Sequence, residues 1–168
     1  MPLNSTLGAG SNVGAVLSGQ SLGATGTNTV YDVGATAFNL ASGGVLTLNF
    51  TGSNENIIFK MSSTLITESG SSVVVNGADS TDHVFWEVGS SATLGTTTSF
   101  VGDIVANIAV TLDTGATIGC GSVTAQTAAV TMDSDTISNT CSYGSGGIKE
   151  VPEPGTFVLL LAGLLGNG

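Results

Sequence analysis

Three aspartates in the second half of the sequence are candidates for binding a metal ion. Asp113, Asp133 and Asp135 carry carboxylate oxygens of the kind that calcium prefers. The glycine-rich nonapeptide repeat of calcium-binding β-rolls is absent, which favours solvated carboxylates at chain corners. A polysaccharide lyase would need a basic catalytic residue, but there is no arginine, and Lys60 and Lys149 lie away from the aspartates. We therefore predict no metal ion and no cofactor.

The single histidine, the single tryptophan and the two cysteines are the other side chains with possible chemical roles. His83 belongs to no recognisable motif with a nucleophile and an orienting acid, so a hydrolase triad is not supported. Trp86 stands in an alternating apolar run, which favours a core position over a sugar platform. Cys120 and Cys141 are too few for a zinc site. One structural disulfide in an exported protein is the better interpretation, with two buried free thiols as the alternative.

Small uncharged residues dominate the composition. The 168 residues include 25 glycines, 23 threonines and 20 serines, against two lysines and no arginine. Long polar side chains, which normally cover solvent-facing helices, are scarce, and this excludes a helical bundle. The net charge of −10 excludes a basic stripe for nucleic acid or anionic lipid. With no catalytic constellation, the sequence predicts a protein that is not an enzyme and has no small-molecule substrate.

Short strands follow one another through the middle of the chain. Runs rich in Val, Ile, Thr and Phe alternate with polar residues and are bounded by Gly, Ser, Asn and Asp. Four clear examples are residues 45–50, 56–61, 71–77 and 84–89.

A repeat of about 18 to 20 residues indicates that these strands form a coil. Segments 91–107, 109–126 and 129–138 align, and a fainter copy lies at 63–77. Such a period suits a parallel β-solenoid with three short faces. One threonine recurs in each copy, at positions Thr64, Thr93, Thr111 and Thr131.

The alternation of the strands predicts which side chains face outward. Val110 and Leu112 should point inward, and Thr111 and Asp113 outward. The four recurrent threonines should then form an outward ladder with rungs about 4.7 to 4.9 Å apart. Glycine at the corners would permit the positive φ that each turn of the coil needs.

The chain divides into four segments. Residues 1–30 are expected to form a partial N-terminal coil or cap, 31–141 the solenoid, 142–150 a linker and 151–168 an apolar tail. The apolar run of the tail is shorter than the roughly 20 residues of a membrane-spanning helix. No signal peptide is visible at the start of the sequence.

The residues of this solenoid resemble those of the ice-binding-like family, the domain of unknown function 3494. The resemblance covers about residues 30–138 and is carried by VFWEVGSSATLG and VTLDTGATIGCGSVTAQTAAVTMDSDTIS. It implies an all-β, right-handed parallel solenoid of triangular cross-section. We expect little or no accompanying helix, because residues 11–24, the nearest candidate, are rich in glycine. Cys120 and Cys141 fall where members of this family often carry a cysteine pair.

The tail VPEPGTFVLLLAGLLG is similar to the PEP-CTERM sorting signal. This resemblance implies processing by an exosortase-type enzyme in a Gram-negative bacterium, and a secreted or cell-envelope-anchored protein. Such a signal normally ends in arginines, and the family domain normally begins with a signal peptide and further strands. We therefore expect truncation at both ends. The residues that match the sorting motif are Val151, Pro152, Glu153 and Pro154.

The family resemblance implies binding to the surface of an ice crystal, which inhibits ice growth and recrystallisation. Threonine suits this role because its stiff side chain presents both a methyl group and a hydroxyl group without charge. A non-enzymatic adhesion or structural protein of the cell surface or matrix is the alternative. The candidate ice-binding residues are Thr64, Thr93, Thr96, Thr98, Thr111, Thr114, Thr117 and Thr131.

Overall fold

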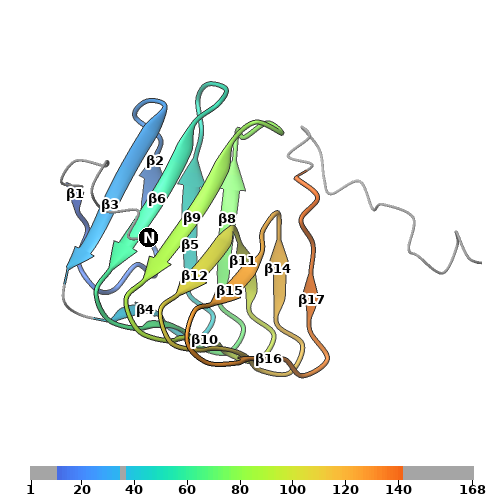
Figure 1. Ribbon diagram of the computed structural model, residues 1–168. Coiled ribbons are helices and arrows are strands. Elements are labelled where there is room, and N and C mark those ends of the chain that lie inside the picture. Colours follow the sequence, from blue (N-terminus) through green and yellow to red (C-terminus); the bar gives the residue numbers. More distant parts are fainter. Residues whose placement is uncertain (1–10, 35–36, 142–168) are drawn as a thin grey trace, which may run out of the picture.

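Short parallel strands wind around a single core in three sheets (Figure 1). The computed structural model describes residues 11–34 and 37–141, and this part of the chain contains seventeen strands and no helix. Successive strands pass from one sheet to the next, and the pairs within each sheet are parallel. The all-β parallel solenoid expected from the sequence is confirmed, as is the lack of an accompanying helix among the described residues.

From β2 onward, each sheet takes every third strand of the coil, and β1 joins the first sheet beside β3. Sheet A contains β1 (Ser11–Asn12), β3 (Asn28–Gly34), β6 (Asn56–Met61), β9 (His83–Val88), β12 (Asp103–Ala106) and β15 (Val123–Ala125). Sheet B contains β4 (Phe38–Leu40), β7 (Leu65–Thr67), β10 (Ala92–Leu94), β13 (Val110–Leu112) and β16 (Val130–Thr131). Sheet C contains β2 (Ser21–Gly23), β5 (Val45–Asn49), β8 (Ser72–Asn76), β11 (Ser99–Val101), β14 (Thr117–Gly119) and β17 (Thr136–Ile137).

The register of sheet B confirms the threonine repeat over three coils and corrects it in a fourth. Thr93 pairs with Thr111, and Thr111 pairs with Thr131. Thr93 pairs on its other side with Ile66, so the alignment of Thr64 with Thr93 is wrong by two residues. The loop between β8 and β9 makes that coil longer than the later ones. An alignment that assumes a constant repeat therefore gives the wrong register for Thr64.

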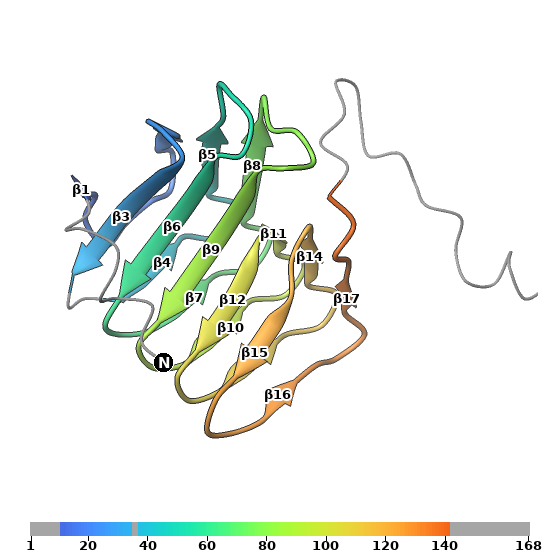
Figure 2. The ribbon, with the colours of Figure 1, turned by 45° about the horizontal axis from the view of Figure 1, so that its top comes forward.

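The coils are wider at the N-terminal end than at the C-terminal end. Stacked residues Asn28 and Asn56 lie 28 positions apart in the sequence, whereas Gly89 and Asn107 lie 18 apart. The long strands β3, β6 and β9 stand at the wide end, and β12 and β15 at the narrow end (Figure 2).

Aromatic side chains fill the wide coils. Tyr31, Phe59 and Trp86 lie in register on the inner side of sheet A, with ring centroids 5.6 Å and 4.1 Å apart. Ile104 and Val123 take this position in the narrower coils that follow. Larger side chains thus stand where the coil encloses more space, as a close-packed interior requires. Trp86 is fully buried, which confirms its predicted core position.

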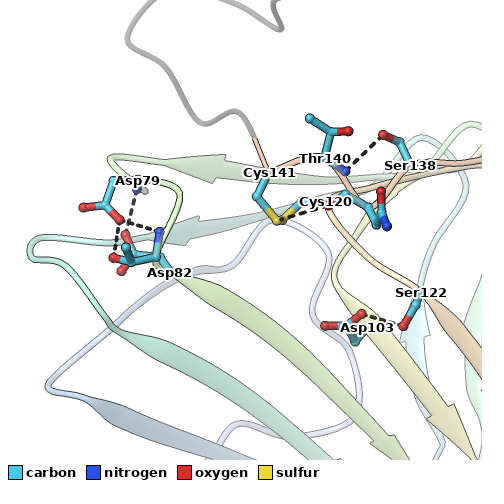
Figure 3. The surroundings of a disulfide bond; sticks show 10 residues. Asp79, Asp82, Asp103, Cys120, Ser122, Ser138, Thr140 and Cys141 are labelled. Carbon is cyan, nitrogen blue, oxygen red and sulfur yellow. Dashed lines mark hydrogen bonds between the residues drawn. A yellow bond between two sulfur atoms is a disulfide. The ribbon is translucent and has the colours of Figure 1, made fainter. Parts of the chain in front are cut away.

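A disulfide joins Cys120 to Cys141, as expected (Figure 3). Cys120 follows β14 and Cys141 follows β17, so the bridge ties the exit of the last coil to the coil before it. The two cysteines are 21 positions apart in the sequence.

The predicted linker 142–150 and sorting segment 151–168, including Val151, Pro152, Glu153 and Pro154, lie outside the described residues. Strands β1 and β2 place described residues before position 31 in the same sheets as the rest of the solenoid. Within the described ranges, no helix has the length and apolar character needed to cross a membrane.

Substitution of two neighbouring aromatic residues tests whether the side chains of β9 alternate between the core and the outer surface. Trp86→Ala should reduce the free energy of unfolding by about 4 kcal/mol, because it removes the centre of the aromatic stack. Phe85→Ala, on the outward side of the same strand, should cost only about 1 kcal/mol. Denaturant unfolding followed by circular dichroism measures both. Equal losses would show that the strand does not alternate as described.

Removal of the disulfide tests its contribution to the last coil. The double variant Cys120→Ser, Cys141→Ser should lose about 3 kcal/mol of unfolding free energy, the loop-closure contribution for 21 residues. Unfolding curves of the wild-type protein with and without reductant provide the comparison. An unchanged midpoint after complete reduction would mean that the bridge adds nothing to stability.

Candidate binding surface

Half-buried charged side chains lie on the outward side of sheet A. Asp32, Lys60 and Glu87 occupy one position in the register of adjacent strands, and Asp103 lies opposite Phe85 in the neighbouring row. Charged groups hold their own hydration shells, so this face is poorly suited to order water in any other pattern.

Sheet B presents two rows of uncharged side chains. Their neighbours along each strand, such as Leu65, Ala92 and Val110, are fully buried. The first outward row contains Asn39, Ile66, Thr93, Thr111 and Thr131. The second row consists of the residues that come directly before the first paired residue of each strand. They are Ala37, Thr64, Ser91, Ala109 and Ala129. Thr64 therefore shares this face with Thr93, Thr111 and Thr131, although it stands in the other row.

A tight turn joins sheet B to sheet C in each coil. The N–H of Thr98 donates to the carbonyl of Gly95 at 3.0 Å, and that of Ala116 donates to Asp113 at 3.0 Å. Adjacent turns are also bonded to one another, since the N–H of Thr97 donates to the carbonyl of Thr114 at 3.1 Å. The corner thus repeats from coil to coil with the same spacing as the strands.

Thr96, Thr114 and Thr117 lie exposed at or beside this corner. The prediction for Thr98 is wrong, because its side chain is fully buried beneath the corner. Its hydroxyl donates to the carbonyl of Glu68 at 3.3 Å and lies 3.1 Å from the hydroxyl of Thr67. The turn rotates Thr98 to the inner side of the coil, where Ala116 stands in the next coil.

Sheet C continues the uncharged surface beyond the corner. Ser99 pairs with Thr117 and Ser72, and Thr117 pairs with Thr136. Of these residues, only Thr117 is among the candidates chosen from the sequence. The missed signal is a spacing of three residues after the corner, which links Thr96 to Ser99 and Thr114 to Thr117. The outward row contains Val45, Ser72, Ser99, Thr117 and Thr136, and the next row along the strands includes Ser21, Thr47 and Val74.

Charged side chains occur near the corner but not within the outward rows of sheets B and C. Glu68 and Asp113 precede the turn, and Asp133 occupies the corner of the last coil. Among the described residues, the rows on both sides of the turn consist of hydroxyl, amide and apolar side chains, the largest of them Ile66. Neighbours within a row are about 4.7 to 4.9 Å apart along the axis, and rows on one strand face are about 6.6 Å apart.

The carboxylates of Asp79 and Asp82 have structural roles in the loops at the wide end. Asp82, which is fully buried, accepts hydrogen bonds from the backbone N–H groups of Glu55 and Asp79, each at 2.8 Å. The pKa of Asp79 is lowered by hydrogen bonds to its carboxylate, of which the one from the Ser53 hydroxyl has the largest effect and those from Thr81 the next largest. In the part of the chain that the structure describes, no group of three histidine, cysteine or acidic side chains is arranged to hold a metal ion.

Residues 5–138 match the family described as Ice-binding-like. The chain is 44% identical over 119 residues to an ice-binding protein of Nostoc sp. (strain HG1), a match that covers 70% of this chain and 44% of the relative. The chain therefore spans less than half the length of that curated relative.

Two solved structures have a similar fold. One is the ice-binding protein of the Antarctic ascomycete Antarctomyces psychrotrophicus, with a TM-score of 0.69, 35% identity, and coverage of 82% of this chain and 64% of that one. The other is a DUF3494 domain of a Shewanella frigidimarina ice-binding protein, with a TM-score of 0.65, 26% identity, and coverage of 76% and 52% respectively.

Proposed function

The chain belongs to the ice-binding-like family, and from this membership and its surface we propose that it binds ice. Adsorption to ice crystals would inhibit their growth and recrystallisation. The observation that carries the proposal is the pair of uncharged faces, sheets B and C, whose outward side chains repeat in register from coil to coil.

The chemistry of these rows suits an ordered water layer. A threonine methyl group is poorly hydrated and leaves neighbouring waters free to bond to one another, while its hydroxyl donates and accepts hydrogen bonds. The β-branched side chain is stiff at χ1, so its groups keep the same positions from rung to rung. A lysine or arginine would impose its own hydration shell, and neither occurs on the outward rows of sheets B and C in the described residues.

The backbone beneath the rows supports a rigid surface. The central strands of both sheets are hydrogen-bonded on two sides. The side chains that alternate with the exposed threonines are buried in the core, Leu94 and Leu112 in sheet B and Phe100 and Ile118 in sheet C. Elements with many buried apolar contacts and paired backbone groups open least in the native state. We therefore assign the ice contact to the rows on both sides of the corner, with Thr93, Thr111, Thr131, Thr96, Thr114 and Thr117 as contact residues.

One coil provides a matched test, since it carries one outward threonine on each face. Thr111 lies on sheet B, Thr117 on sheet C and Thr124 on sheet A. Thr111→Tyr and Thr117→Tyr should each reduce thermal hysteresis at equal protein concentration by at least about tenfold, as for a central interface residue. Thr124→Tyr should leave it unchanged. All three should stay within about 0.5 kcal/mol of wild-type stability.

The pattern of losses identifies the face. A loss with Thr124→Tyr alone would move the ice contact to sheet A, and no loss in any variant would refute an ice contact through these rows. A wild-type protein without thermal hysteresis or inhibition of recrystallisation would leave the adhesion or structural function as the better account.

We also propose that residues 151–168 act as a sorting signal that an exosortase-type enzyme processes, so that the protein is secreted or anchored at the cell envelope. The proposal rests on the sequence Val151, Pro152, Glu153, Pro154 followed by an apolar run. A disulfide is also typical of proteins that pass through an oxidising compartment.

Co-expression with an exosortase tests the sorting signal. The full chain should lose its C-terminal segment, seen as a lower intact mass, and the variant Pro152→Ala, Pro154→Ala should keep it. The same intact mass for wild type and variant in cells that process a known substrate would contradict the proposal.

A further inference from the structure

The corner of one coil contains a threonine in a conformation that normally requires glycine. Thr97 has φ of +57°, and it is the only β-branched residue with positive φ among those described. The left-handed region brings Cβ close to the carbonyl oxygen, and a branched side chain makes this more unfavourable.

In other coils, glycine occupies the same position of the turn and adopts the positive φ with less strain. The third residue of the corner turn is Gly43, Gly70 or Gly115 in the other coils, with φ of +65°, +67° and +75°. The last coil has Ser134 there, with φ of +58°. Glycine therefore fits this turn, and nothing in the turn itself requires threonine at position 97.

The residues on either side of Thr97 fix its backbone. Gly95 lies so close to the previous coil that a Cβ would meet the carbonyl oxygen of Thr67 at 2.6 Å. Thr98 is held below by the carbonyl of Glu68, and its hydroxyl lies 3.3 Å from that of Ser71. Because both flanks are anchored in the core, Thr97 cannot relax to negative φ without breaking these contacts.

The side chain of Thr97 projects from the exposed corner in a fixed orientation. Its hydroxyl donates to the carbonyl of Thr96 at 2.7 Å. Its methyl carbon, Cγ2, lies 3.7 Å from the place where a Cβ on Gly115 would stand. The methyl group thus lies against the glycine of the next coil, at a corner where Thr96 and Thr114 are also exposed.

We propose that Thr97 is an ice-contacting residue whose methyl group makes the corner surface continuous across Gly115. This inference rests on the proposed ice binding and adds to it a residue that the threonine repeat does not contain. Strained backbone that persists where glycine would fit is typical of positions retained for function.

The variant Thr97→Gly tests the proposal, because stability and ice binding should change in opposite directions. Relief of the positive φ should raise Tm by about 2 °C. Loss of the methyl contact should lower the affinity for ice by about fourfold, the equivalent of one buried methyl group. Partition of the protein into slowly grown ice and thermal hysteresis measure the second effect.

Asn54→Gly is the matched control. Asn54 also has positive φ, +58°, but it lies in an exposed loop at the wide end of the solenoid. Its backbone N–H donates to the hydroxyl of Thr81. This variant should not lower Tm and should leave ice affinity unchanged.

Unchanged ice affinity in Thr97→Gly would overturn the inference, as would a lower Tm, which would make Thr97 a structural residue. The proposed function fails separately, since it requires that the wild-type protein itself enters ice.

Discussion

The parallel register between successive coils is the constraint on which the rest of the molecule depends. Each strand bonds to the equivalent strand one coil away, so any side chain stands directly above its counterpart. Inside, this places Tyr31, Phe59 and Trp86 in one stack; outside, it places Thr93, Thr111 and Thr131 in one row. The backbone hydrogen bonds thereby convert a repeat in the sequence into a repeat in space, and this alone produces a surface with regularly spaced side chains.

The corner couples the interior to this surface. The turn sends Thr98 inward and leaves Thr96 and Thr97 outside. Beneath it, the buried Thr98 hydroxyl is hydrogen-bonded to the buried hydroxyls of Thr67 and Ser71. Buried hydroxyl groups must be paired to avoid a large desolvation penalty, so this network defines one conformation of the turn. The charged side chains, in contrast, are placed on sheet A, in the loops or at the edges of the rows.

The sequence predicts the fold well where successive coils have nearly the same length. From residue 91 to 138 the coil length changes by only one or two residues, and the aligned segments pair in the structure as the repeat predicts, for example Thr93 with Thr111 and Thr111 with Thr131. The repeat misplaces Thr64 by two residues, because the earlier coils contain loops of other lengths. The burial of Thr98 and the strain at Thr97 depend on backbone angles within the turn, which a pattern of residue types does not specify.

The most direct test of the account is whether the wild-type protein enters ice. A labelled, disulfide-bonded sample would be placed in a dilute solution from which ice is grown slowly on a cold finger, together with a second protein of similar size and charge. Ice binding predicts that the ice fraction is enriched in the protein relative to the liquid, while the second protein is excluded. Exclusion of both proteins to the same degree would contradict it.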